Sequence, residues 1–292
     1  MYITKKATVF LVLTFLVGWT ASILSWWLGG ADGEIKDLQI GGFINVFSPA
    51  FAALLCAMAF EKGARLEALG LSFRPNWWWL WALLIPAGII ALTILITALF
   101  SKYNLVGIED MAKQLAAERR QQYSDATVYL ARAAGETGIA LIAYSLFFTV
   151  SEELGWRGYL YHLWRRFGFW RYSFATGIIW GVWHWPLIYL FGLNYPDQRA
   201  LGLLLFPLFD MLFAALMTLV RDRGGSVWAA GIMHGSINAL TILTIVTVDA
   251  AQFPWTLPGL SGIAAMSIGV LLIASFQLRD PQFGKAQEKK PH

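Results

Sequence analysis

Charged residues are scarce in this sequence. Only 14% of its 292 residues are Asp, Glu, Lys or Arg, whereas 58% are hydrophobic, and the mean hydropathy is +0.56. Soluble domains usually contain about 25% charged residues. The composition therefore excludes an ordinary soluble protein. It predicts an all-α polytopic membrane protein, because helices are one of the two structures that satisfy the backbone within a bilayer.

Cysteine and the common hydrolase patterns are also lacking. Cys56 is the only cysteine, so no intramolecular disulfide can form and the redox compartment is not indicated. The pattern Gly-x-Ser-x-Gly, which presents a serine nucleophile, is absent, and so is the zinc-binding pattern His-Glu-x-x-His. These absences argue against a serine hydrolase of that kind and weaken the case for a zinc protease.

What the sequence does contain is a series of apolar runs long enough to cross a bilayer, which takes roughly 17–25 helical residues. The predicted bundle has eight spans, at about residues 7–28, 40–60, 79–100, 138–163, 172–191, 200–220, 226–246 and 258–278. The first run follows Lys5 and Lys6, but it is longer than the apolar region of a signal peptide and lacks a small-x-small cleavage site. We therefore expect it to be retained as the first span.

Basic residues predict the orientation. With the N-terminus inside, most Lys and Arg residues fall in cytoplasmic segments, and the short outer loops carry only Lys36 and Arg199. Residues 101–137 are an exception, since their mixture of charged and apolar residues predicts short amphipathic helices along the membrane surface. We expect both termini in the cytoplasm. The net charge of +4 indicates attraction to membrane lipids, with no need for a nucleic-acid partner.

Ionisable and strongly polar side chains are few within the predicted spans. They are Glu152, Glu153, Arg157, His184, Asp210, His234 and Asn238. A charge at the bilayer centre costs about 2.5–3.5 kcal/mol even on gentle scales, so these residues mark a functional site by default. A rise of 1.5 Å per residue places Glu152, His184 and His234 roughly 12–18 Å from the inner ends of three different spans. These spans, the fourth, fifth and seventh, thus bring polar groups to one layer.

The spacing of these groups indicates their chemistry. Glu153 and Arg157 are four residues apart and can pair on one helical face, while Glu152 points about 100° away. His234 and Asn238 also share a face. A carboxylate beside a neutral imidazole can take a proton from water, and a second imidazole with a carboxamide can stabilise an oxyanion. Such a set can hydrolyse an amide without a covalent intermediate.

Three short motifs contain these residues, in order, on the three spans. They are "EELGWR", "WGVWH" and "HGSIN", and their characteristic positions are Glu152, Glu153, Arg157, Trp180, His184, His234 and Asn238. In this combination the sequence resembles the CPBP family of intramembrane proteases, which includes CAAX prenyl proteases of the Rce1 type and many bacterial Abi proteins. The family motifs are Glu-Glu-x-x-x-Arg, an aromatic residue four positions before His, and His-x-x-x-Asn. Trp180 stands where Phe is commoner.

The resemblance implies a role for each motif residue. Glu152 is expected to be the base and His184 to position the water, while His234 and Asn238 contact the oxyanion. Glu153 and Arg157 are expected to order the site. The implied enzyme is a glutamic-type intramembrane endopeptidase of a bacterial plasma membrane, without a cofactor. Its expected substrate is a membrane-associated or lipidated protein or peptide, with prenylated CAAX proteins among the candidates.

The same resemblance suggests a division of the chain. It covers about residues 138–246, which we predict to form the catalytic core. Residues 1–137 would form an N-terminal region of three spans and the amphipathic loop, and residues 247–292 the last span and a cytoplasmic tail. Asp210 lies within the core but belongs to none of the motifs, so we expect it to pack beside the site.

Two other functions fit the same residues. Glu152, His184 and His234 provide a carboxylate and two imidazoles, which can hold a catalytic zinc ion with water at the fourth position. Alternatively, Glu and His side chains can form a relay in a proton-coupled transporter or a non-proteolytic immunity protein. Transporters commonly show paired half-repeats and broken helices at matched positions, which this sequence does not indicate.

The histidine motifs also have purely structural explanations. His184 lies two residues before Pro186, so its ring could meet a backbone carbonyl freed by a proline kink. His234 lies near Gly231 and Gly235, where close helix packing could allow an interhelical hydrogen bond. Each explanation suffices for one motif, but neither accounts for three motifs at one depth.

Overall fold

The computed structural model describes residues 4–29, 39–101, 104–248 and 255–279. Within these residues the chain is helical without a strand, apart from one isolated bridge between Leu105 and Val248. The described part contains eight helical segments that are long and apolar enough to cross a membrane. The prediction of an all-α polytopic membrane protein is therefore confirmed.

Most of the predicted spans correspond to one helix each. These are α1 (Lys5–Leu28), α2 (Gln39–Phe60), α4 (Trp77–Phe100), α10 (Arg199–Gly224) and α13 (Leu260–Arg279). The short helix α3 (Arg65–Ala68) connects α2 to α4. Their ends follow local sequence signals. The Asn76 side chain, for example, accepts a hydrogen bond from the Trp78 N–H and caps α4, ahead of its interior Pro86.

The three spans that carry the motifs are interrupted instead. The fourth consists of α6 (Ala126–Phe148), the π-helix η2 (Thr149–Leu160), α7 (Tyr161–Trp164) and the short turn η3 (Arg165–Phe167). The fifth consists of α8 (Phe169–Trp183) and α9 (Trp185–Phe191), and the seventh of α11 (Val227–Leu240) and α12 (Leu243–Val246). The local irregularities of the membrane helices thus gather around the polar residues.

The fourth span begins earlier than the predicted residue 138. Asp125 accepts a hydrogen bond from the Val128 N–H and starts α6 at Ala126. In the preceding segment, α5 (Ile108–Arg119) is the short helix that the sequence predicts. Glu136 on α6 forms ion pairs with Arg119 and Arg132, at 2.6 and 2.8 Å, which explains how charged residues enter this helix. The surface segment is accordingly shorter than expected.

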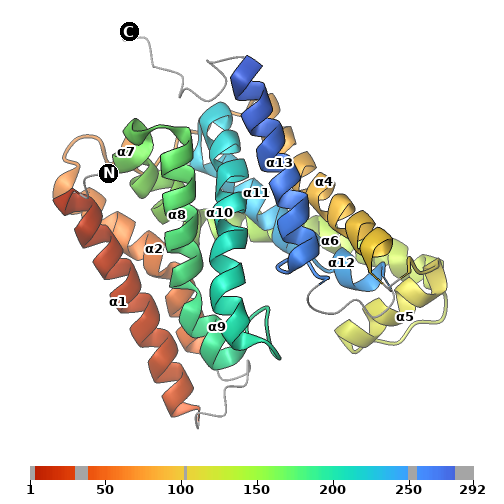
Figure 1. Cartoon of the computed structure of the whole chain (residues 1–292). Helices are drawn as coiled ribbons and strands as arrows, with labels where there is room; N and C mark the ends of the chain where they lie inside the picture. Colours follow the sequence, from red (N-terminus) through yellow and green to blue (C-terminus); the bar gives the residue numbers. More distant parts are fainter. Residues whose placement is uncertain (1–3, 30–38, 102–103, 249–254, 280–292) are drawn as a thin grey trace.

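Segments distant in sequence lie side by side (Figure 1). α8 packs against α10, α6 against α11, and η2 against both α2 and α11. Every residue of η2 except Val150 is buried. The charged stretch of the fourth span therefore faces protein on nearly all sides, which removes most of the cost of placing it in hydrocarbon.

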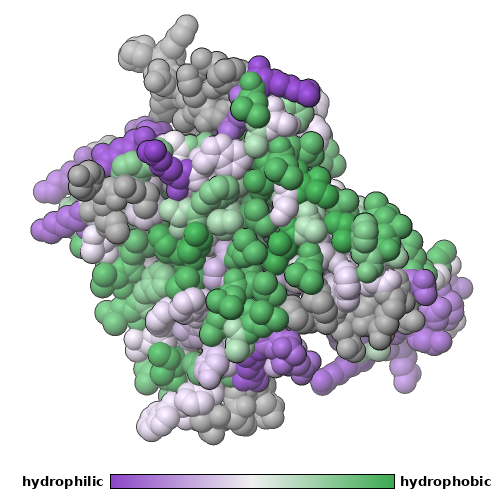
Figure 2. Space-filling view, viewed as in Figure 1, coloured by the Kyte–Doolittle hydropathy of each residue, from purple (hydrophilic) through white to green (hydrophobic). Residues whose placement is uncertain are grey.

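The outer surface has the opposite character. Figure 2 shows apolar residues covering the middle of the visible face, with hydrophilic residues gathered toward its margins. Large apolar side chains stand out from several helices, including Leu16, Leu204 and Leu271, whose exposed fractions are 61%, 71% and 68%. Extensive apolar exposure of this kind is typical of a membrane-facing surface. The protein is an integral, multi-pass membrane protein.

Candidate active site

The carboxylates of the first motif lie on the π-helix η2. π-Helices are rare, commonly form a single turn, and often occur at functional sites, yet η2 extends over 12 residues. Its turn is wider than that of an α-helix, so the angle between consecutive side chains is smaller. Glu152 and Glu153 are consequently separated by less than the 100° of an α-helix, and they contact different neighbours.

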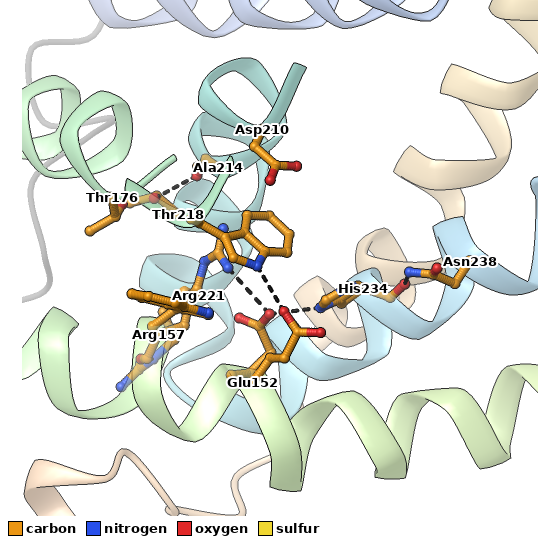
Figure 3. Close-up of polar contacts among 12 residues, drawn as sticks. Glu152, Arg157, Thr176, Asp210, Ala214, Thr218, Arg221, His234 and Asn238 are labelled. Carbon is orange, nitrogen blue, oxygen red and sulfur yellow. Dashed lines mark hydrogen bonds and ion pairs between the residues drawn. The ribbon is translucent and has the colours of Figure 1, made fainter. Parts of the chain in front are cut away.

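Glu153 joins the first and third motifs. Its Oε1 accepts hydrogen bonds from Arg157 Nη1 at 3.2 Å and from His234 Nδ1 at 2.8 Å. The predicted pairing of Glu153 with Arg157 is therefore present, and Figure 3 shows Arg157 and His234 on opposite sides of the neighbouring Glu152. A carboxylate can only accept here, so His234 Nδ1 carries a proton. His234 Nε2 makes no hydrogen bond within the described ranges.

The ring of His234 is held by close helix packing. It stacks on Phe148 with the ring centres 4.0 Å apart and the planes at 14°. Gly235 allows this approach, because a Cβ at that position would lie 2.2 Å from the Ser145 backbone nitrogen. Gly231 similarly faces Thr149. The close packing that the sequence suggested at these glycines is present, and it directs His234 toward the carboxylate of Glu153.

Glu152 is turned toward the fifth span. Its Oε2 accepts a hydrogen bond of 2.7 Å from the indole N–H of Trp180, and the residue is only 2% exposed. The other oxygen, Oε1, makes no hydrogen bond with a residue that the structure describes. One oxygen of Glu152 is thus fixed, and the other can accept a proton from water.

Trp180 is the side chain that contacts all three motifs. Besides its bond to Glu152, its ring lies 4.3 Å from the guanidinium carbon of Arg157. The ring centres of His184 and His234 lie 5.8 and 5.1 Å from that of Trp180. The sequence identified Trp180 as the aromatic residue of the second motif but assigned it no role. Glu152, His184 and His234 therefore each lie beside the same indole ring.

His184 lies at the break between α8 and α9. Its backbone N–H bonds to the Gly181 carbonyl, which leaves the Trp180 carbonyl without its usual helical partner. His184 Nδ1 lies 2.9 Å from that carbonyl, and Pro186 follows in the first turn of α9. Because a carbonyl only accepts, Nδ1 carries the proton and Nε2 presents a lone pair. The contact expected of a packing histidine is therefore present, and it also determines the tautomer.

Asp210 reaches the second motif from α10. Its Oδ2 lies 3.6 Å from His184 Nδ1, and the residue is 1% exposed. The two helices approach closely at Gly177 and Gly181, where a Cβ would lie 2.5 Å from the Asp210 carbonyl oxygen and 2.4 Å from Pro207 Cα. Sequence reasoning overlooked this Gly-x-x-x-Gly spacing, which is typical of tightly packed membrane helices.

Asn238 does not join the other side chains. It is exposed, and its Nδ2 donates to the His234 carbonyl at 3.0 Å, four residues earlier on α11. Figure 3 places it beyond His234 and away from Glu152. The resemblance implies an oxyanion contact for Asn238, but in this structure its amide bonds to the carbonyl four residues earlier on its own helix.

The contacts of Glu152, His184 and His234 also bear on whether these side chains could hold a zinc ion. No group of three His, Cys, Asp or Glu side chains in the described part of the chain is arranged to hold a metal ion. Both histidines use Nδ1 for protein acceptors, and Glu152 uses one oxygen for Trp180. These contacts leave Nε2 of both histidines and Oε1 of Glu152 without a hydrogen bond among the described residues, so the hydrogen bonds alone do not decide against zinc.

Comparison with known families agrees with the motifs. Residues 135–240 match the model of the Rce1-like family, described as type II CAAX prenyl endopeptidase Rce1-like. This segment is about a third of the chain and contains all three motifs. No curated protein sequence matches the chain.

Proposed function

The chain has an Rce1-like segment of the CPBP family, and from this premise we propose that Glu152 activates water for peptide-bond hydrolysis inside the membrane. The family match supports a CAAX-type intramembrane protease in general, acting on a membrane-associated substrate. The proposal adds the residues and their order of action, and it names lipidated proteins or peptides, including prenylated CAAX proteins, as the substrate class.

The observation that carries the proposal is the different use of the two histidines. His184 Nδ1–H bonds to a neutral carbonyl, so its Nε2 lone pair can accept a hydrogen bond from water. His234 Nδ1–H bonds to the carboxylate of Glu153, which can stabilise a doubly protonated ring. Only in that imidazolium form can His234 donate from Nε2 to an oxyanion. His184 can therefore bind the attacking water, and His234 can stabilise the negative charge that develops on the oxyanion.

The reaction can be written with these atoms. Water between Glu152 Oε1 and His184 Nε2 loses a proton to Glu152 as its oxygen forms a bond to the peptide carbonyl carbon. His234 Nε2–H stabilises the oxyanion. Glu152 then passes the proton to the amide nitrogen as the C–N bond breaks, and the amine leaves. Asn238 can contribute only if its amide leaves the His234 carbonyl, so we assign it the smaller share.

A cleavage assay with the full chain in proteoliposomes tests this proposal. The probes are a farnesylated fluorogenic peptide ending in a CAAX sequence and the same peptide without the lipid. Glu152→Gln should reduce turnover by at least about a thousandfold without lowering the melting temperature, because the amide cannot accept the proton. Full activity of the variant would remove Glu152 from the role of base. A comparison of membrane proteomes with either protein would then identify natural substrates.

The proposal needs no metal cofactor. Activity of the purified protein should survive a strong chelator, and elemental analysis should find no stoichiometric zinc. Loss of activity on chelation, with recovery when zinc is added back, would favour the metalloprotease alternative.

Interrupted spans give the transporter alternative one supporting observation. Broken helices line the substrate sites of many transporters, usually at matching positions in two halves of the chain. Here the breaks lie in the fourth, fifth and seventh spans, around one polar cluster. Proton or solute flux that depends on Glu152, in proteoliposomes that cleave no peptide, would support this second function.

A further inference from the structure

Asp210 is a buried carboxylate that the proposed reaction does not use. It is 1% exposed, and its Oδ2 has no hydrogen-bond partner within the described part of the chain. His184 Nδ1 lies 3.6 Å from this oxygen, which is longer than a hydrogen bond. Burying a polar group without a partner is costly, so its retention beside a site histidine calls for an explanation.

The position of Asp210 is fixed by backbone packing. The approach of α8 to α10 at Gly177 and Gly181 leaves no space for a Cβ on either glycine, and the Asp210 carbonyl forms part of the contact. The segment of α10 that carries Asp210 therefore cannot move away from α8 without opening this interface. Its carboxylate is held facing the edge of the His184 ring that bears Nδ1.

We propose that Asp210 is a positioning residue that keeps the proton of His184 on Nδ1, an inference that rests on the proposed function. Two acceptors, the Trp180 carbonyl and the Asp210 carboxylate, face Nδ1. The opposite tautomer would turn a nitrogen lone pair toward both acceptors and would be repelled by them. The lone pair is therefore kept on Nε2, where it can receive the water. Asp210 acts through His184 and does not contact the substrate.

This role predicts an unusual order among substitutions. Asp210→Asn should be more harmful than Asp210→Leu, because its amide N–H can donate to Nδ1 and stabilise the wrong tautomer. We expect kcat to fall about a hundredfold in Asp210→Asn and about tenfold in Asp210→Leu, with KM within about twofold of the unsubstituted value. A residue needed only as a buried polar group would give the opposite order.

A second readout does not depend on activity. Nitrogen-15 NMR of histidine-labelled protein, with the His184 signals assigned from a His184→Gln sample, should show a proton on Nδ1. In Asp210→Asn part of the population should move the proton to Nε2. Thr218→Val is the matched control, since Thr218 is a buried polar residue of the same helix that donates only to the Ala214 carbonyl at 2.7 Å. It should change neither the tautomer nor kcat.

The outcomes separate the two proposals. An unchanged His184 tautomer in Asp210→Asn would overturn the positioning role, as would a loss confined to KM or a greater loss in Asp210→Leu. If the unsubstituted protein cleaves no probe but the tautomer responds as described, the proposed function fails while Asp210 still controls the proton of His184.

Discussion

His234 and His184 both contact Trp180, but they are held in different ways. His234 bonds to the buried carboxylate of Glu153 and stacks on Phe148, so charge and packing fix the ring together. His184 bonds to a main-chain carbonyl at a helix break, and the carboxylate beside it stands at 3.6 Å. The two histidines show how identical side chains acquire different functions, because the acceptor at Nδ1 determines what Nε2 can do.

The Glu153 network, which consists of Glu153, Arg157 and His234, should be more sensitive to substitution than the contacts of His184. Glu153→Gln would leave Arg157 and His234 without their counter-charge inside the bundle, and breaking a buried pair costs about 3–5 kcal/mol. We expect the free energy of unfolding in detergent to fall by about this amount, with a corresponding loss of yield. Glu118→Gln is the control, because Glu118 is exposed on α5. An unchanged melting temperature with a selective loss of turnover would show that Glu153 acts in the reaction and is not needed for stability.

The third motif offers a comparison within one helix. Removing one oxyanion donor commonly lowers kcat by about 10²–10³, and we expect a loss of that size for His234→Ala. Asn238→Ala should lower kcat by less than about tenfold, because its amide bonds to its own helix. Equal losses in the two variants would mean that Asn238 rotates into the site when substrate binds. Single-turnover assays with the farnesylated probe would measure both effects.

Trp180→Phe tests the side chain that contacts both histidines, with a smaller expected loss than His234→Ala. Phenylalanine keeps a ring beside the histidines but removes the donor to Glu152 Oε2. A hydrogen bond to a charged group contributes about 1.5–3 kcal/mol, so kcat should fall by about tenfold or somewhat more. Trp156→Phe is a matched control, because Trp156 is fully buried and its indole N–H has no partner among the described residues. Similar losses in both variants would indicate a general packing effect.

Hydropathy predicted the fold because eight apolar runs are separated by polar segments. It missed the start of the fourth span, where Arg132 and Glu136 resemble a surface segment until their pairing is known. That pairing depends partly on Arg119 from α5, which periodicity within one helix cannot reveal.

The sequence predicted which residues form the site better than it predicted the contacts between them. Motif spacing identified Glu152, His184 and His234, and the structure brings them around one indole. The donor role of Trp180 was not foreseen, since spacing reveals an aromatic ring but not the direction of its N–H. The bond of Asn238 to its own helix was also not foreseen, because motif spacing does not show that the carbonyl four residues earlier competes for the amide.

The wide sequence separation within the Glu153 network has a consequence for biosynthesis. His234 lies 81 positions after Glu153, so at roughly 5–20 residues per second the ribosome makes it several seconds later. Arg157 is only four positions away and is synthesised almost at once. Glu153 and Arg157 can therefore pair before the seventh span exists, whereas Glu152 meets Trp180 only when the fifth span follows. Arg157 can thus neutralise Glu153 during insertion, before His234 is synthesised.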